Sequence, residues 1–267
     1  MAFLNRKSLL SRRKPMAAAV VIAVGLIVAG GSYAAATAAI KGQQSSTVAS
    51  AAQIDEGHKL FLANCATCHG KNAEGTKNAP TLIGVGAAAV DFQVGSGRMP
   101  AQVSGPQVAA KDPSEFTDKQ IAALAAYVAS IGPGPAVPSD AMVSPNGNAT
   151  RGGELFRTNC AMCHNAAGAG GALTQGKYAP ALTETGTKEM YEAMITGPQN
   201  MPVFNDANLT PKDKKDIITY LVYLQNNPSP GGLDLENIGP VAEGLFVWIF
   251  VLGGIIAITV WLGAKSN

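Results

Sequence analysis

Charged residues are scarce in this chain, and most of the sequence is apolar or small. Of the 267 residues only 14% are charged, whereas 47% are hydrophobic, and the formal net charge is +2. A balance so close to neutral gives no basis for binding nucleic acid. Cysteine and histidine are scarcer still, with four and three residues. The alternation of apolar and polar residues that is typical of strands is almost absent, which predicts an all-α fold.

All four cysteines fall into two copies of one pattern, Cys-x-x-Cys-His. The copies are Cys65-Ala66-Thr67-Cys68-His69 and Cys160-Ala161-Met162-Cys163-His164. This pattern is typical of covalent haem c attachment, in which both thiols add to haem vinyl groups and the histidine ligates the iron. The two copies therefore predict two covalently bound haem c groups and one-electron transfer.

Two other interpretations would use the same cysteines. Zinc sites usually pair Cys-x-x-Cys units about 15–20 residues apart, whereas Cys68 and Cys160 lie much farther apart. A redox-active dithiol is expected after a strand in a βαβ unit, and no such alternation flanks either motif. Both interpretations are therefore disfavoured.

The surroundings of the first motif are repeated around the second. Gly57-x-x-Leu60-Phe61-x-x-Asn64 corresponds to Gly152-x-x-Leu155-Phe156-x-x-Asn159. Further along, Met99-Pro100 corresponds to Met201-Pro202, and residues 117–128 correspond to 210–221. Two tandem domains of one kind explain this repeat better than a single fold.

Two methionines in corresponding loops are the candidates for the second axial position of each iron. Met99 and Met201 each precede a proline, between the histidine motif and the last helix of their domain. A thioether ligand raises the reduction potential. Near Pro80 and Pro180, a backbone carbonyl could accept the Nδ1–H of the ligand imidazole and fix its orientation. The predicted axial pairs are His69 with Met99 and His164 with Met201.

Other residues are assigned to structure rather than to chemistry. Met190 and Met194 lie at helical spacing and are expected in a core, whereas His58 is expected at the surface rather than as an alternative ligand. An apolar face leading into the first motif is expected from Ile54, Phe61 and Leu62.

Helix starts are marked before the last helix of each domain. Thr117 with Gln120 three residues later forms a predicted capping box. Thr210 followed by Pro211 is typical of an N-cap with proline at the first helical position.

Two long uncharged runs flank the haem motifs. Residues 245–264 carry Trp248 and Trp261 near their ends and precede Lys265, which predicts a membrane-spanning helix, with a buried core helix as the alternative. Residues 16–40 follow a basic cluster, which predicts a cytoplasmic N-terminus. We favour a retained anchor here, and a removable signal peptide is the alternative. The cluster consists of Arg6, Lys7, Arg12, Arg13 and Lys14.

These signals divide the chain into seven segments and place the haem motifs outside the cytoplasmic membrane. Both termini are cytoplasmic if the N-terminal segment is retained. The expected segments are residues 1–40 (basic N-terminus and apolar anchor or signal), 41–53 (linker), 54–131 (first haem domain), 132–150 (Pro/Gly linker), 151–226 (second haem domain), 227–240 (linker) and 241–264 (transmembrane helix).

Residues 54–131 and 151–226 resemble class I cytochrome c domains. The shared features are Gly-x-x-x-Phe on the first helix, Cys-x-x-Cys-His, a proline, an axial methionine and an apolar last helix with a tyrosine. The resemblance implies that the Gly/Phe pair of each first helix packs against the last helix near its tyrosine. These residues are Gly57, Phe61 and Tyr127 in the first domain, and Gly152, Phe156 and Tyr220 in the second.

The whole arrangement is similar to the dihaem cytochrome cc subunits of actinobacterial cytochrome bcc complexes, which are menaquinol:cytochrome c oxidoreductases of the aerobic respiratory chain. This resemblance implies a cytochrome b subunit, a Rieske iron–sulfur protein and an aa-type cytochrome oxidase as partners, with the lipid bilayer around the anchor. Electrons would pass from the Rieske cluster through the Cys65 haem to the Cys160 haem and on to the oxidase. The chain would act as an electron-transfer subunit of the reductase, without substrate chemistry of its own.

Two other functions stay open. Another membrane-held dihaem carrier, such as a subunit of a cbb-type oxidase or of a dehydrogenase, is disfavoured because such cytochromes commonly carry only an N-terminal anchor. A dihaem catalyst such as a peroxidase needs an exchangeable axial position, which two methionine ligands would not leave.

Overall fold

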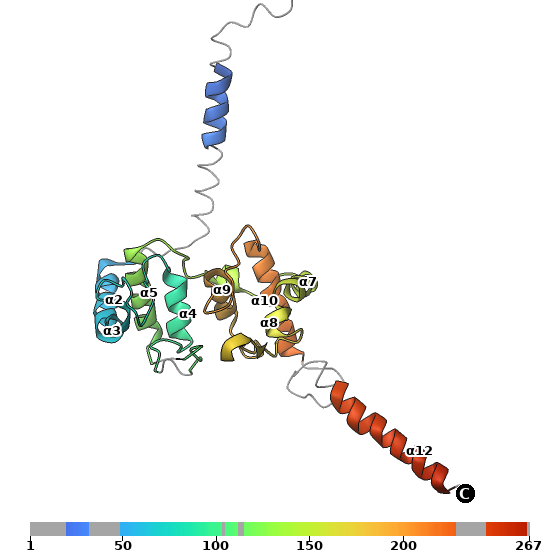
Figure 1. Ribbon diagram of the computed structural model, residues 1–267. Coiled ribbons are helices and arrows are strands. Elements are labelled where there is room, and N and C mark those ends of the chain that lie inside the picture. The colour runs from blue at the N-terminus through green and yellow to red at the C-terminus, as the bar shows by residue number, and fades with distance from the viewer. Residues whose placement is uncertain (1–19, 32–48, 103–104, 112–114, 228–243, 266–267) are drawn as a thin grey trace, which may run out of the picture. The chain divides into compact units, whose positions relative to one another are not determined.

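The computed structural model of the chain describes residues 20–31, 49–102, 105–111, 115–227 and 244–265. Helices dominate these residues (Figure 1). The first domain contains α2 (Ala51–Asn64), α3 (Ala66–His69), α4 (Ala87–Gly95) and α5 (Asp118–Ile131). The elements that follow are α6 (Asp140–Val143), α7 (Ala149–Asn159), α8 (Ala161–His164), β1 (Gly171–Ala172), η1 (Thr174–Gly176), β2 (Tyr178–Ala179), α9 (Thr187–Thr196), α10 (Pro211–Asn226), η2 (Val247–Leu252) and α12 (Gly253–Lys265).

The first domain is built on the crossing of α2 and α5, and a glycine allows their close approach. Gly57 lies against the backbone carbonyl of Ala123 and the Cβ of Tyr127, so that any side chain there would collide with α5. One turn later, the rings of Phe61 and Tyr127 meet with centroids 5.2 Å apart. The predicted packing is confirmed. The buried core consists of Phe61, Ala73, Val90, Val94, Ile121, Leu124, Ala125, Tyr127 and Val128.

The second domain repeats this crossing with α7 and α10. Gly152 lies against the backbone carbonyl of Asp216, and the rings of Phe156 and Tyr220 meet with centroids 5.7 Å apart. The predicted packing is confirmed here too. The buried core consists of Leu155, Phe156, Met190, Tyr191, Met194, Leu209, Ile217, Ile218 and Leu221.

The last helix of each domain begins where its capping signal predicts. At the start of α5, the backbone N–H of Thr117 donates to Gln120 Oε1 at 2.9 Å. At the start of α10, Thr210 Oγ1 accepts from the backbone N–H of Asp213 at 3.2 Å, and Pro211 is the first helical residue. These bonds satisfy polar backbone groups at the helix ends, and so they fix where the two helices begin.

The predicted apolar face of α2 is wrong at Leu62, because this residue is 45% exposed. The buried stripe of α2 runs through Ile54, Gly57 and Phe61, which share a face at helical spacing, and Leu62 falls to one side of it. The residues that the structure describes are otherwise all-α as predicted, apart from the two-residue strands β1 and β2, which pair antiparallel.

The structural assignments of the remaining residues are confirmed. Met190 and Met194 on α9 are both 4% exposed and belong to the second core. His58 lies at the surface, where its ring stacks on Tyr127 with centroids 4.8 Å apart.

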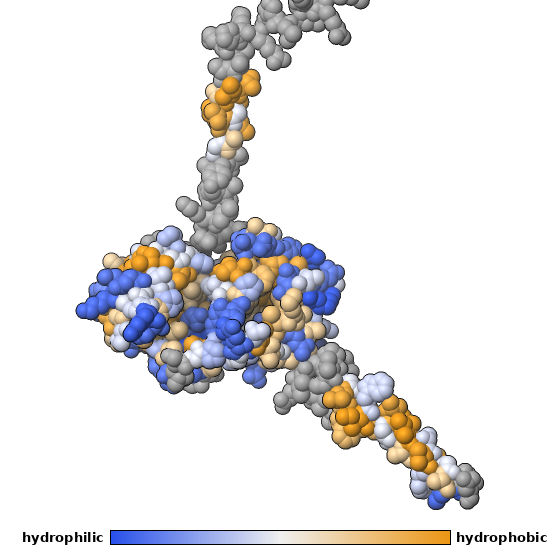
Figure 2. Space-filling view, viewed as in Figure 1, coloured by the Kyte–Doolittle hydropathy of each residue, from blue (hydrophilic) through white to orange (hydrophobic). Residues whose placement is uncertain are grey.

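The C-terminal apolar run forms a continuous helix from Gly244 to Lys265, in which η2 is a stretch of π-helix. Its 22 residues are long and apolar enough to cross a membrane. Apolar side chains are exposed along its whole length (Figure 2). Trp248 and Trp261 are also exposed, at 68% and 57%. This exposure argues against the alternative of a buried core helix.

The N-terminal apolar run is described only in part. Residues Val20–Gly31 form an apolar helix that is shorter than the about 20 residues needed to span a bilayer. The basic cluster, the rest of the run at 16–40 and most of the predicted linkers at 41–53 and 227–240 lie outside the described residues. The choice between anchor and signal peptide stays a prediction.

Candidate haem-binding sites

Each Cys-x-x-Cys-His motif is folded as one short helical turn at the end of a longer helix. Cys65 ends α2 by donating its N–H to Phe61 O at 2.8 Å, and the His69 N–H donates back to Cys65 O at 2.9 Å. The second copy repeats both bonds at 2.8 Å and 2.9 Å, around Cys160. The backbone angles of Cys65 (φ −121°, ψ −33°) and Cys160 (φ −121°, ψ −35°) nearly coincide. The repeat seen in the sequence is therefore a repeat in three dimensions.

The first cysteine of each motif has a raised thiol pKa, and the described residues contain no cluster that could hold a metal ion. All four cysteines are free. Burial, and then the neighbouring Cys68, raise the pKa of Cys65 to about 11. The pKa of Cys160 is raised to about 11 by burial and by Cys163. Reactive dithiols and zinc ligands need thiolates, and within the described residues no group of three or more His, Cys, Asp or Glu side chains could hold a metal ion.

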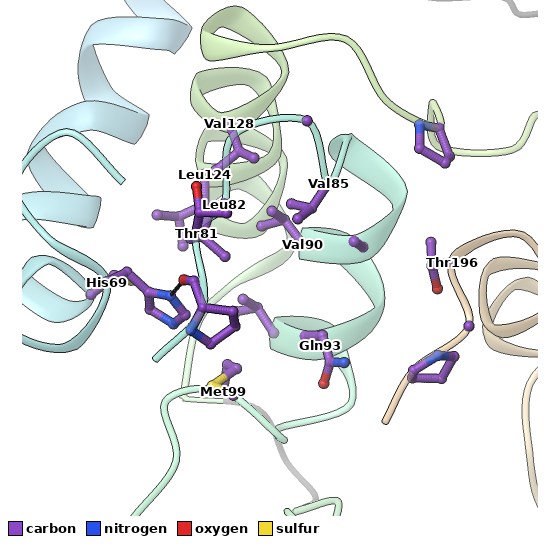
Figure 3. Close-up of a pocket in the computed structure, with 18 of the residues that line it drawn as sticks. His69, Thr81, Leu82, Val85, Val90, Gln93, Met99, Leu124, Val128 and Thr196 are labelled. Carbon is purple, nitrogen blue, oxygen red and sulfur yellow. Dashed lines mark hydrogen bonds between the residues drawn. The ribbon is translucent and has the colours of Figure 1, made fainter. Parts of the chain in front are cut away.

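Both histidines are oriented by a backbone carbonyl, as the prolines predict. His69 Nδ1 lies 2.8 Å from Pro80 O, the bond drawn dashed in Figure 3, and His164 Nδ1 lies 2.9 Å from Pro180 O. A carbonyl only accepts hydrogen bonds, so Nδ1 must carry the proton and Nε2 keeps its lone pair for a metal. Burial lowers the pKa of His164, with the Pro180 bond opposing it, so burial favours the neutral ring.

The first motif opens onto a largely apolar cavity of about 550 Å³. Cys65, His69 and Met99 all line it, and Figure 3 shows His69 and Met99 beside the aliphatic side chains of Leu82, Leu124 and Val128. Met99 is fixed by its backbone N–H, which donates to Gln93 O at 2.9 Å. The volume is in the range of cofactor sites.

A second cavity, of about 290 Å³, lies at the second motif. It is lined by Cys160, Cys163, His164 and Met201, and the backbone N–H of Met201 donates to Pro198 O at 3.0 Å. The structure thus brings the histidine and methionine of each predicted set to one cavity, with both cysteines of the second set but only Cys65 of the first, since Cys68 is exposed and does not line the first cavity. Apolar walls, thiols at the rim and a free imidazole nitrogen fit a covalently attached haem in each domain.

Comparison with known protein families assigns both domains to cytochromes. Residues 54–132 match the family described as cytochrome c. Residues 147–221 match cytochrome C oxidase, cbb3-type, subunit III. Among solved structures, a chain of the Kuenenia stuttgartiensis reducing HAO-like protein complex Kustc0457/Kustc0458 covers 64% of this chain and 96% of its own length, but the TM-score is 0.33 at 16% identity, too low to bear on the fold.

Relatives that match over most of this chain decide the family. A "Cytochrome bc1 complex cytochrome c subunit" from Corynebacterium efficiens is 46% identical over 232 residues, which cover 80% of this chain and 78% of that protein. The subunits so described from Mycobacterium leprae and Mycobacterium tuberculosis are also 46% identical, covering 81% and 82% of this chain and 77% and 80% of theirs. The chain belongs to this family of cytochrome bc1 complex cytochrome c subunits.

Family membership confirms the resemblance that the motifs carry. The chain is therefore an electron-transport protein with covalently bound haem c, built from two cytochrome c domains. Its C-terminal helix, Gly244–Lys265, makes it a membrane-associated carrier.

The two domains of the cytochrome c subunit are joined along α4 and α9, which lie side by side in Figure 1. Two glutamines pair with backbone across this boundary. Gln107 donates to Tyr178 O at 2.8 Å and accepts from Tyr178 N–H at 2.7 Å. Gln199 donates to Val108 O at 2.9 Å and accepts from Val108 N–H at 3.1 Å.

Each cavity of the cytochrome c subunit is closed in part by the other domain. The wall of the first cavity includes Thr196, which Figure 3 shows on a separate segment facing the pocket, and the wall of the second includes Arg98. Sequence reasoning missed these cross-domain residues. A local motif carries no signal for them, because they act on a cavity whose ligands lie in the other repeat.

Proposed function

We propose that the cytochrome c subunit is a dihaem relay with one haem c in each domain. The thioether bonds are formed by Cys65 and Cys68 to the first haem and by Cys160 and Cys163 to the second. The axial ligands are His69 and Met99 for the first iron and His164 and Met201 for the second. The grouping of each histidine and methionine pair around one cavity supports this assignment.

The observation that carries the relay is that the two cavities have a common wall. Pro198 and Gln199 line both of them. Haems in these cavities would be separated by little more than this segment, so an electron could pass between them without separation of the domains. The protein's part is to hold the two groups at a fixed spacing and to exclude water from them.

The relatives' description as subunits of a bc1 complex supports a place in a quinol:cytochrome c reductase. In our proposal a Rieske iron–sulfur protein reduces the first haem, the second haem reduces an aa-type oxidase, and a cytochrome b subunit lies beside the C-terminal helix. Lys265 at the end of that helix favours a cytoplasmic C-terminus and haem domains on the other side of the membrane.

This proposal is tested by purifying the subunit from native membranes in mild detergent. Two haem c per chain are expected, together with haem b and haem a in the reduced-minus-oxidised spectrum. One haem c per chain would overturn the dihaem assignment. Two haem c without haem b or haem a, from membranes whose other respiratory complexes stay intact, would indicate an independent carrier.

The match of residues 147–221 to a cbb3-type oxidase subunit favours a second candidate, a carrier within such an oxidase. That candidate predicts co-purification of high-spin haem b with copper and no haem a. Adding cyanide or peroxide distinguishes a dihaem catalyst from a relay, because the spectrum of two low-spin haems with methionine ligands should not change with either addition.

The axial ligands are tested by Met99→His and Met201→His. Each substitution should lower the reduction potential of its own haem, within the roughly 0.8 V range that axial ligands span. Redox titration of the purified protein measures both potentials, and Met142→His, at a partly buried methionine that lines neither cavity, is the matched control. If neither potential moves, the assignment of the methionines is wrong.

A further inference from the structure

Arg98 belongs to the first domain by sequence but faces the haem cavity of the second. It directly precedes Met99, which lines the first cavity. Arg98 itself lines the second cavity, together with Cys160, His164 and Met201. The φ of 66° at Gly97 turns the chain at this point. Consecutive residues of one loop are therefore directed to different haem sites.

A phenylalanine of the first domain holds the guanidinium in place. The Arg98 Cζ lies 4.8 Å from the centroid of the Phe92 ring. Phe92 is 5% exposed and also lines the second cavity, whereas Val90 and Gln93 on the same helix line the first. Helix α4 thus forms part of both cavities. On the side that lines the second cavity, Phe92 forms a cation–π pair with Arg98.

Within the part of the chain that the structure describes, no ion pair compensates the charge of Arg98. The side chain is half-buried, and burial lowers its pKa, with Glu189 and Tyr178 of the second domain acting in the opposite direction. Among the described residues the guanidinium forms no ion pair and donates no hydrogen bond. A partly desolvated cation is costly unless an anion compensates it, and the cavity it faces is where an anionic partner would be bound.

We propose that Arg98 is part of the binding site of the second haem, where its guanidinium pairs with a propionate carboxylate of that haem. This inference rests on the second haem proposed above. The planar guanidinium can donate two parallel hydrogen bonds to a carboxylate. Its positive charge stabilises the ferrous state, because reduction adds one negative charge to the haem and the nearby guanidinium attracts that charge. Docking of the first domain therefore raises the potential of the second haem.

The test is a redox titration of the detergent-purified full chain in four forms: wild type, Arg98→Gln, Arg98→Lys and Lys111→Gln. Lys111 is the matched control, because it is a cation of the same domain whose N–H donates to Ser96 O at 3.0 Å, close to Arg98, yet it lines neither haem cavity. Met201→His identifies the potential that belongs to the second haem. The Met-to-iron charge-transfer band checks that both methionines stay bound.

Arg98→Gln should lower the second potential, Arg98→Lys should lower it less, and Lys111→Gln should leave it unchanged. The proposal is overturned if the second potential is the same in Arg98→Gln and wild type. It is overturned equally if only the first potential moves, since Arg98 would then act through its neighbour Met99. A wild-type protein with a single haem would overturn both this inference and the dihaem assignment, whereas two haems with an unchanged second potential would overturn this inference alone. If Arg98→Gln does not fold, the comparison of Arg98→Lys with wild type decides.

Discussion

The last helices of the two domains, α5 and α10, begin with similar caps and make the same helix crossing, yet they bury side chains of different polarity. Aligned on their capping residues, Ile121 and Ala123 of α5 correspond to Lys214 and Asp216 of α10. The first pair is buried and apolar, at 6% and 3% exposed, whereas both members of the second pair are 0% exposed. The same helix crossing is therefore compatible with apolar and with charged side chains.

Local partners make the charged version possible. Lys214 Nζ donates to Asp206 Oδ1 and to Leu209 O, both at 2.7 Å. Asp216 Oδ1 accepts from the N–H of Asn148 at 2.7 Å, and its other oxygen accepts from Lys212 Nζ at 2.6 Å. Each buried charge is thus compensated, as burial requires. The bond to Asn148 also ties the start of α7 to α10, a link between helices that an alanine at this position cannot make.

The largest expected effect comes from the feature that both domains share, the glycine at the helix crossing. Gly57→Ala and Gly152→Ala should each destabilise their own domain by about 3 kcal/mol, because the new Cβ would overlap a backbone carbonyl that cannot move freely. Hydrogen exchange resolved by domain measures this. Gly95→Ala is the control, since nothing lies within 4 Å of a Cβ there. Equal stability of Gly57→Ala and Gly95→Ala would contradict the packing described for α2 and α5.

Exchanging Ala123 of α5 and Asp216 of α10 tests whether local partners are what stabilise a charged side chain at this crossing. Asp216→Ala removes the acceptor of the part-buried bond from the Asn148 N–H and should destabilise the second domain by about 1–3 kcal/mol. The reverse exchange, Ala123→Asp, should destabilise the first domain more, because a buried carboxylate there has no prepared partner. Chemical denaturation followed by domain-resolved hydrogen exchange gives both values. Asp216→Asn keeps an acceptor and is the control; if it is as damaging as Asp216→Ala, the bond to Asn148 is not what stabilises this crossing.

A pH-dependent effect is expected where the corresponding helices α4 and α9 meet. Glu192 is 1% exposed, its Oε1 has no partner among the described residues, and Asp91, which ion-pairs with Lys188, lies beside it. Burial, and then the charge and hydrogen bond of Asp91, raise the pKa of Glu192 from 4.5 to about 9, against the opposing charge of Lys188, while Glu189 adds to the rise.

A raised carboxyl pKa means that the folded protein holds this proton more tightly than the unfolded chain. Its contribution to stability is full below pH 4.5 and is lost as pH rises toward 9. We expect the melting temperature to fall across this range and Glu192→Gln to remove the dependence, with a gain on the order of 5 °C at the alkaline end. Glu154→Gln, an exposed carboxylate on α7, is the control. An unchanged pH profile in Glu192→Gln would contradict a buried protonated carboxyl between the domains.

The sequence alone determined the parts of this protein that depend on residues close together in the chain. The Cys-x-x-Cys-His turns, the capping box at Thr117, the N-cap at Thr210, the apolar helix at the C-terminus and the tandem repeat all follow from short-range geometry and composition. Even the contacts of His69 and His164 with the carbonyls of Pro80 and Pro180 could be predicted, because those residues lie a short loop apart and the pattern occurs twice.

Only the tertiary structure decided the features that join distant segments. The exposure of Leu62 depends on which side of α2 meets α5, and the burial of Lys214 and Asp216 depends on partners gathered from other turns and helices. The placement of Arg98 in the second cavity depends on how one domain rests against the other. Such contacts form between side chains whose separation along the chain bears no relation to their distance in space, so no local pattern records them.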